Sequence, residues 1–354
     1  MAGISATVAA ECAKGIDKLY SAIAFLLWLG PFHLNIAFLI LIPFGLLSSF
    51  TFPIVITLLT FLVFLAVIPI EYKSTVGTPV ANWSYFSKSQ VLSADQAGYS
   101  LLRDRMFFNW ICRFICKYAT KHFPIKVVAD DVEALDSNRS YVVVLEPHSI
   151  LPLGVLAFLE YSDLFPLKKV RVLVTSTALG TPVLRHIWTW MGAMPASGEA
   201  FRKLLCSGIS GVIVPGGVQE CLYMQRNREV VYLKKRFGFV RIAIQEGSPL
   251  VPVFVFGQTK IYDYVKPKGS KWYNQLSRII GFAPLWMWGE YGTIIPYRRP
   301  MYVAVGKPIE VNQIEAPSRE EIGGVHAIYL KALEELFERH KEAAGYKDTQ
   351  LDIY

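Results

Sequence analysis

The sequence is poor in charged residues: Asp, Glu, Lys and Arg make up 18% of its 354 residues, whereas the hydrophobic set reaches 53%. Soluble domains average about 25% charged residues. The scarcity of charge argues against a disordered chain, which combines low hydrophobicity with high charge. The composition also argues against a collagenous chain. We therefore expect a membrane-associated protein with a substantial folded part.

Cysteine pairs and several catalytic motifs are also missing. The five cysteines are odd in number and form no C-x-x-C pair, which predicts free thiols in a reducing compartment. The sequence contains no G-x-S-x-G, G-x-x-x-x-G-K-[ST], H-E-x-x-H or G-x-G-x-x-G. These absences argue against a serine lipase, an NTPase, a zinc protease and a dinucleotide enzyme.

The net charge of +8 suits an anionic partner, such as phospholipid headgroups or a nucleotide-bearing substrate. No basic run is interleaved with aromatic residues, and the sequence contains no recognisable nucleic-acid-binding module. Nucleic acid is therefore not an expected partner.

A region from Leu19 to Ile70 has no Asp, Glu, Lys or Arg. A membrane pass needs about 20 apolar residues, so this region is long enough for two. We expect a short cytosolic N-terminus (1–20) and a transmembrane hairpin (21–70) with spans at about 22–42 and 53–70. A buried helical pair in a soluble core is the alternative. Lysines flank the region on both sides, which favours cytosolic termini on a multi-pass protein.

Charge returns after Glu71, and residues 71–354 are expected to form a cytosol-facing, membrane-attached domain. Its first helix, 101–120, has an aromatic face and a basic stripe, typical of a packed amphipathic helix or of one at a membrane surface. Six mostly apolar runs predict strands buried on both faces, and hence a largely parallel α/β sheet flanked by helices. The runs are 126–129, 141–145, 170–175, 211–215, 250–255 and 301–305. Ser318 and Glu321 form a capping box that opens a last helix ending at Gly345.

Glu146-Pro147-His148-Ser149 directly follows the second of these strands. A histidine at the carboxyl end of a strand can act as a general base near neutral pH, although a structural loop histidine is the alternative. Phosphate-acceptor acyltransferases carry an H-x-x-x-x-D box, and here Leu153 stands at the aspartate position. Any carboxylate that orients His148 is then expected from elsewhere in the chain.

Two further segments contain residues suited to catalysis or to substrate binding. Gly216 and Gly217 follow a strand, and exposed N–H groups there can stabilise a carbonyl oxygen that gains charge, unless they form a plain strand-to-helix turn. Glu220 can orient His148 or bind an acceptor. The segment 234–241 has four cations in eight residues, which can bind phosphates or form a solvated face.

Taken together and in order, these blocks resemble the diacylglycerol O-acyltransferase type 2 family. The form is the plant one, in which Glu-Pro-His-Ser (146–149) replaces His-Pro-His-Gly. The match extends over 181–192, 214–220, 236–257, 305–309 and 336–341. It covers the chain from about Glu71 onwards, together with the preceding hairpin. One departure is His122-Phe123-Pro124, where the family often has Tyr-Phe-Pro.

The resemblance implies a glycerolipid-acyltransferase-like fold and an enzyme that acylates diacylglycerol from acyl-CoA. It implies that His148 is the catalytic base, that Glu146 or Glu220 orients it, and that Gly216 and Gly217 hold the oxyanion. The implied acyl-CoA-binding residues are Arg185, Arg236, Gly238, Phe239 and Arg241. The implied reaction requires no metal and no bound cofactor.

The sequence specifies the acyl acceptor and the cellular location less closely. The segment 215–220 contains no arginine, which favours an uncharged acceptor. Monoacylglycerol or a fatty alcohol is the alternative acceptor, and a non-catalytic lipid-droplet hairpin protein is the alternative function. The resemblance implies the endoplasmic reticulum membrane, with membrane lipid as a partner and lipid droplets as a second location. The oligomeric state stays open, a homo-oligomer included.

Overall fold

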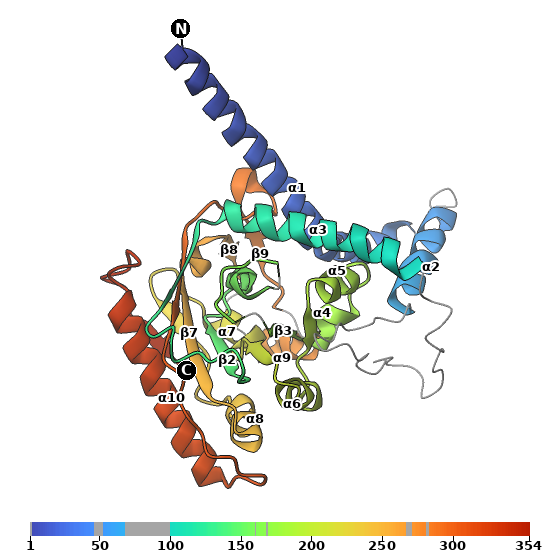
Figure 1. Cartoon of the computed structure of the whole chain (residues 1–354). Coiled ribbons are helices and arrows are strands. Elements are labelled where there is room, and N and C mark those ends of the chain that lie inside the picture. Colours follow the sequence, from blue (N-terminus) through green and yellow to red (C-terminus); the bar gives the residue numbers. More distant parts are fainter. Residues whose placement is uncertain are drawn as a thin grey trace. The chain divides into compact units, whose positions relative to one another are not determined.

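The computed structural model describes the main chain of residues 2–45, 52–67, 100–159, 161–167, 169–266, 271–280 and 283–354. The chain forms two compact units. Unit 1 comprises Met1–Lys121 with Ser176–Ala193, and unit 2 comprises His122–Thr175 with Met194–Tyr354. Helices build most of the described part of unit 1, and unit 2 carries the main sheet (Figure 1). The predicted boundary at residue 71 lies outside the described residues and stays a prediction.

Aromatic packing joins two long helices of unit 1. The rings of Phe114 and Tyr118 lie 5.9 and 5.0 Å from the ring of Tyr20, and the Ser21 hydroxyl donates to the Tyr118 carbonyl at 3.1 Å. The aromatic face of the helix predicted at 101–120 therefore packs against another helix. The helices of unit 1 are α1 (Ala2–Gly45), α2 (Phe52–Val67), α3 (Ser100–His122), α4 (Ser176–Gly180) and α5 (Leu184–Trp190).

The structure does not support the transmembrane hairpin. The second predicted span, 53–70, overlaps α2 (Phe52–Val67), and its residues 68–70 lie outside the described residues. The first predicted span, 22–42, is part of the longer α1. Among the residues that the structure describes, no helix is both long and apolar enough to cross a membrane.

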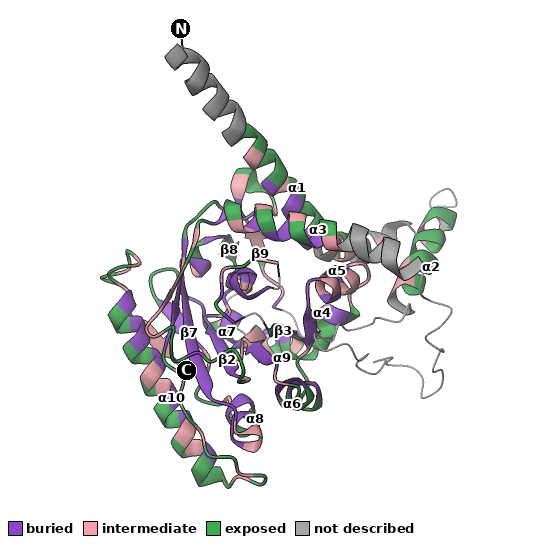
Figure 2. Ribbon diagram, in the orientation of Figure 1, coloured by how far each residue is buried: buried purple, intermediate pink, exposed green. Residues whose placement is uncertain are grey.

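A seven-stranded sheet with the order β1-β10-β7-β2-β5-β3-β4 forms the core of unit 2. The pairs β1–β10, β2–β7, β2–β5 and β3–β5 are parallel, whereas β10 runs antiparallel to β7, so the predicted largely parallel sheet is confirmed. All residues of β2 and β7 are buried (Figure 2). The strands are β1 (Ile125–Ala129), β2 (Val142–Glu146), β3 (Val170–Val174), β4 (Ala193–Pro195), β5 (Ser210–Ile213), β7 (Leu250–Phe256) and β10 (Met301–Val305).

The remaining elements of unit 2 were mostly not predicted. Two small sheets pair β6 (Glu229–Val231) with β11 (Leu351–Ile353) in parallel and β8 (Asp263–Val265) with β9 (Trp286–Trp288) antiparallel. The helices are α6 (Gly198–Cys206), α7 (Gly217–Tyr223), α8 (Gly238–Glu246), α9 (Lys271–Ile280) and α10 (Arg319–His340). Short 3-10 turns are η1 (Leu153–Phe158), η2 (Gln258–Lys260) and η3 (Glu290–Gly292).

Helix α10 begins as its capping box predicts. The Ser318 hydroxyl accepts from the Glu321 N–H at 3.2 Å, and the Glu321 carboxylate accepts from the Ser318 N–H at 2.7 Å. The helix ends at His340 rather than at Gly345, because a turn follows in which Gly345 adopts a φ of 82°. Its Phe337 ring stacks on Phe256 of β7 at 5.3 Å, which attaches α10 to the sheet (Figure 1).

Candidate active site

The loop after β2 presents His148 at the carboxyl edge of the sheet. Its Nδ1 lies 2.8 Å from the carbonyl oxygen of Ser149. Because a carbonyl can only accept, Nδ1 carries the proton and the lone pair is on Nε2. Burial lowers the pKa of His148, so the imidazole is neutral near pH 7. His148 is thus in the tautomer and charge state of a general base that acts through Nε2.

Ser149 has the unusual conformation that brings its carbonyl to the imidazole. Its φ of 56° lies in the left-handed region, which costs a non-glycine residue on the order of 1 kcal/mol. The Ser149 N–H donates to Oε1 of Glu220 at 2.9 Å, and its hydroxyl donates to the carbonyl of Gln258 at 3.4 Å. These contacts hold the strained residue in place.

Gln258 connects the two ends of the same loop. Its side chain is fully buried. The amide nitrogen donates to the carbonyl of Pro147, and the amide oxygen accepts from the N–H of Gly154 at 2.5 Å. Gln258 was not among the residues predicted from the sequence. The available signal was its position directly after Gly257 at the end of β7, since β7 runs parallel to β2 and ends at the same edge.

Glu146 and Glu220 are both fully buried. Glu220 accepts from the main-chain N–H groups of Ser149 and Tyr232, at 2.9 and 3.3 Å. Burial raises the pKa of Glu220 to about 7, although the N–H of Ser149 lowers it in part. The carboxyl of Glu146 lies next to that of Glu220 and near the main chain of Gly216. Burial and the charge of Glu220 raise the pKa of Glu146 well above its usual range, so Glu146 is the protonated member of the pair.

The sequence left open which carboxylate orients His148. In the structure, the group that accepts from Nδ1 is the carbonyl of Ser149. Glu220 acts on the main chain of the loop instead, because it accepts from the Ser149 N–H. The structure therefore brings His148 and Glu220 together through Ser149.

Cys221 lies next to the histidine, but its thiol is not poised for nucleophilic attack. Its Sγ donates to the Ser149 carbonyl at 3.1 Å and lies 3.8 Å from Nδ1 of His148. Burial raises the pKa of Cys221 to about 12, so the thiol stays protonated. Cys221 is a packing and hydrogen-bonding neighbour of the loop.

Gly216 and Gly217 form the turn into α7, as the segment after β5 predicts. A Cβ at Gly216 would lie 2.1 Å from a carboxyl oxygen of Glu220, so a side chain there would displace the buried carboxylate. Gly217 has a φ of 58°. The Arg236 guanidinium donates to the Gly216 carbonyl at 3.1 Å, which ties the predicted cationic segment to this turn. The predicted oxyanion role of the two glycines stays a prediction.

The predicted acyl-CoA residues are divided between the two units. Arg236, Gly238, Phe239 and Arg241 lie in unit 2, whereas Arg185 lies on α5 of unit 1. Gly238 and Arg241 are exposed. Phe239 is only 3% exposed, and its ring packs against that of Tyr329 at 5.1 Å, so the structure gives it a packing role. Acyl-CoA binding by this set stays a prediction.

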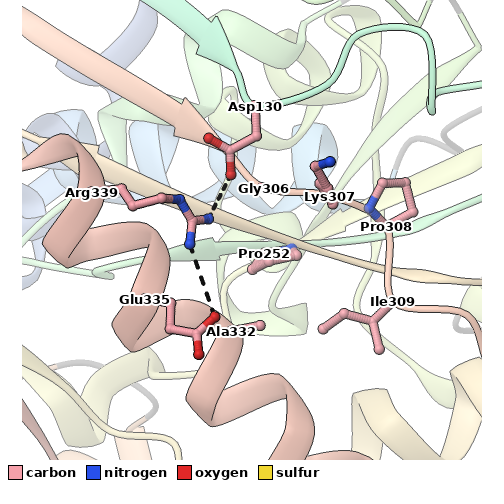
Figure 3. A pocket seen from close by; sticks show the side chains of 9 residues that line it. All are labelled: Asp130, Pro252, Gly306, Lys307, Pro308, Ile309, Ala332, Glu335 and Arg339. Atoms are coloured by element: carbon pink, nitrogen blue, oxygen red, sulfur yellow. Dashed lines mark hydrogen bonds and ion pairs between the residues drawn. The ribbon is translucent and has the colours of Figure 1, made fainter.

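A cavity of about 520 Å³ lies between α10 and the segment after β10 (Figure 3). Figure 3 shows the Arg339 guanidinium between two carboxylates, 2.6 Å from Asp130 and 3.9 Å from Glu335. None of the predicted site residues lines it. Within the described part of the chain, no group of three or more His, Cys, Asp or Glu side chains is arranged to hold a metal ion.

The family model described as diacylglycerol acyltransferase matches residues 100–354. Human 2-acylglycerol O-acyltransferase 3 is 33% identical over 257 residues, covering 67% of this chain and 74% of the relative. Human acyl-CoA wax alcohol acyltransferase 1 is 34% identical over 260 residues, with coverages of 68% and 77%. Human diacylglycerol O-acyltransferase 2 is 30% identical over 267 residues, with coverages of 70% and 68%.

Proposed function

This chain belongs to the diacylglycerol acyltransferase family, and on that premise we propose that it transfers a fatty acyl group from acyl-CoA to the free hydroxyl of diacylglycerol. The products are triacylglycerol and CoA. One observation carries the proposal: the Ser149 carbonyl holds Nδ1 of a neutral His148, which leaves Nε2 as the base.

The chemistry follows from this geometry. Nε2 of His148 takes the proton of the acceptor hydroxyl while the hydroxyl oxygen attacks the thioester carbonyl. The tetrahedral intermediate then expels the CoA thiolate, which receives the proton back from Nε2. N–H groups of the turn at Gly216 and Gly217 stabilise the oxyanion in this scheme. Glu220 contributes by holding the loop that carries the base.

An acceptor other than diacylglycerol is the second candidate. The three relatives are named for 2-acylglycerol, wax alcohol and diacylglycerol, and their identities to this chain lie between 30% and 34%. Monoacylglycerol and a fatty alcohol would use the same base and the same donor. The difference would lie in the acceptor pocket alone.

We also propose that the protein belongs to the plant branch of its family and works at the endoplasmic reticulum membrane and on lipid droplets, with both termini in the cytosol. Glu-Pro-His-Ser at 146–149 supports the branch. The apolar surface of α2 supports membrane attachment, since Ile54, Phe61 and Phe64 are more than half exposed.

The test uses membranes from a host that lacks neutral-lipid synthesis. Labelled oleoyl-CoA is supplied with diacylglycerol, monoacylglycerol or a long-chain alcohol, and wild type is compared with His148→Ala and His148→Gln. Glutamine can still donate to the Ser149 carbonyl but cannot accept the proton, so both variants should lose labelled triacylglycerol. Label in diacylglycerol or wax ester would change the acceptor. No product from inserted wild-type protein would favour a lipid-droplet hairpin protein without catalysis.

A further inference from the structure

Three tyrosines form a contiguous aromatic surface that the proposed reaction does not use. The ring of Tyr223 lies 5.5 Å from that of Tyr232, at an interplanar angle of 23°, and 4.8 Å from that of Tyr354. Tyr223 is 42% exposed and Tyr354 is 37% exposed. We call these three residues the tyrosine cluster. It presents aromatic surface to solvent.

Hydrogen bonds fix the backbone of the tyrosine cluster. The N–H of Tyr354 donates to the Val231 carbonyl at 2.9 Å, and its carbonyl accepts from the N–H groups of Leu233 and Lys234 at 2.9 and 2.7 Å. These bonds continue the pairing of β11 with β6. A surface whose backbone is already ordered loses little entropy when it binds a ligand.

Cations border the tyrosine cluster. Lys234 and Lys235 are exposed, and the Arg236 guanidinium lies 5.1 Å from the centre of the Tyr232 ring. The ion pairs printed for the described residues include none of these three cations. The Arg236 guanidinium already donates to the Gly216 carbonyl, so Lys234 and Lys235 are the cations with most charge available to an anionic ligand.

The tyrosine cluster shares a helix and hydrogen bonds with the candidate active site. Tyr223 is the last residue of α7, the helix that also carries Glu220. The N–H of Tyr232 donates to Glu220, and the side chain of Arg236 donates to the Gly216 carbonyl. A ligand bound over the cluster would therefore lie beside the elements that support His148.

We propose that the tyrosine cluster and the cations Lys234, Lys235 and Arg236 bind the nucleotide part of the acyl-CoA donor, an inference that rests on the proposed function. The adenine base packs against the exposed tyrosine rings, and the phosphates contact the cations. Bases of any kind stack on aromatic side chains, and Lys and Arg bind phosphate oxygens. A nucleotide combines an aromatic base with several negative charges, whereas the acyl chain and diacylglycerol have neither.

The experiment compares Tyr223→Leu with Tyr223→Phe, because leucine removes the aromatic face and phenylalanine keeps it. KM is measured for oleoyl-CoA and for oleoyl-pantetheine, a donor without the nucleotide, at saturating diacylglycerol. Tyr223→Leu should raise the KM for oleoyl-CoA about fivefold or more, as expected for a lost base–aromatic stack. The KM for oleoyl-pantetheine should not change, and Tyr223→Phe should resemble wild type.

Tyr291→Leu is the matched control, since Tyr291 is 90% exposed and lies outside the tyrosine cluster. An unchanged KM for oleoyl-CoA in Tyr223→Leu would overturn the inference, as would equal increases for both donors. If the wild type transfers no acyl group, the proposed function fails, and binding of adenosine 3′,5′-bisphosphate then tests the surface alone. Binding to wild type that is lost in Tyr223→Leu would support the nucleotide site, and equal binding to both would refute it.

Discussion

Replacing Gln258 by leucine should slow catalysis without weakening substrate binding. Leucine has nearly the volume of glutamine but cannot bond the Pro147 carbonyl or the Gly154 N–H, which both lose their side-chain partner in buried surroundings. Each buried main-chain group left unsatisfied costs about 1–3 kcal/mol, so the variant should lose about 2–6 kcal/mol of loop or global stability. A loop displaced by about 1 Å lowers kcat on the order of 100-fold.

The assay measures kcat, both KM values and unfolding in detergent micelles. We expect kcat to fall and both KM values to stay within a factor of about three, because Gln258 holds the base rather than a substrate. Gln258→Glu adds a pH readout. Its carboxyl can accept from the Gly154 N–H at any pH, but it can donate to the Pro147 carbonyl only when protonated. The activity of Gln258→Glu relative to wild type should therefore rise as the pH falls.

Gln313→Leu is the control, since Gln313 donates to the main chain of Gln245 at 3.1 Å on an exposed surface. This variant should keep the wild-type kcat. A Gln258→Leu protein with wild-type kcat would refute the argument that Gln258 positions His148. So would a Gln258→Glu protein whose activity relative to wild type does not change with pH.

Three further predictions concern the buried acids and the loop. Glu220→Gln should lower kcat strongly, because one of the two main-chain N–H groups that donate to Glu220 would face an NH₂ group. Glu146→Gln should stay active, because Glu146 is already neutral. Steady-state kinetics of the two variants checks both expectations. Ser149→Gly should keep activity and change stability by no more than about 1 kcal/mol, since relief of the φ of 56° offsets the weak bond to Gln258; denaturant unfolding checks this. Burial raises the pKa of Glu220 and Glu229 to about 7. Between about pH 4.5 and 7 the folded state therefore binds more protons than the unfolded state. The free energy of unfolding should fall as the pH rises through this window, by on the order of 1 kcal/mol per pH unit for each group. From pH 5 to 8 the melting temperature should fall less steeply in Glu229→Gln than in wild type. Equal slopes in the two proteins would contradict a raised pKa of Glu229.

Local patterns in the sequence were enough to predict most of the sheet and the start of α10. The run at 141–145 is apolar without alternation, and β2 is buried on both faces. Ser318 and Glu321 satisfy each other across three residues, so their capping box depends on nothing distant. The position of His148 after β2 also follows from the sequence, because a parallel strand delivers its carboxyl end to the ligand edge.

Hydropathy located the apolar helices at the N-terminus but not their bounds. The uncharged stretch from Leu19 to Ile70 predicts two spans, and the structure describes α1 over Ala2–Gly45 and α2 over Phe52–Val67. Helix bounds depend on the conformation of the main chain, which composition does not report.

The sequence by itself predicted His148 as the base and placed it directly after β2; the tertiary structure decided which groups hold this histidine. Sequence reasoning placed a carboxylate beside His148, whereas the Ser149 carbonyl takes that role, and Glu220 and Gln258 act on the loop. Ser149 is the neighbour of His148, but Glu220 and Gln258 lie about 70 and 110 residues further along the chain. A strand can be predicted from residues that are neighbours in the sequence. A hydrogen bond between distant segments depends on the register and twist of the sheet that brings those segments together.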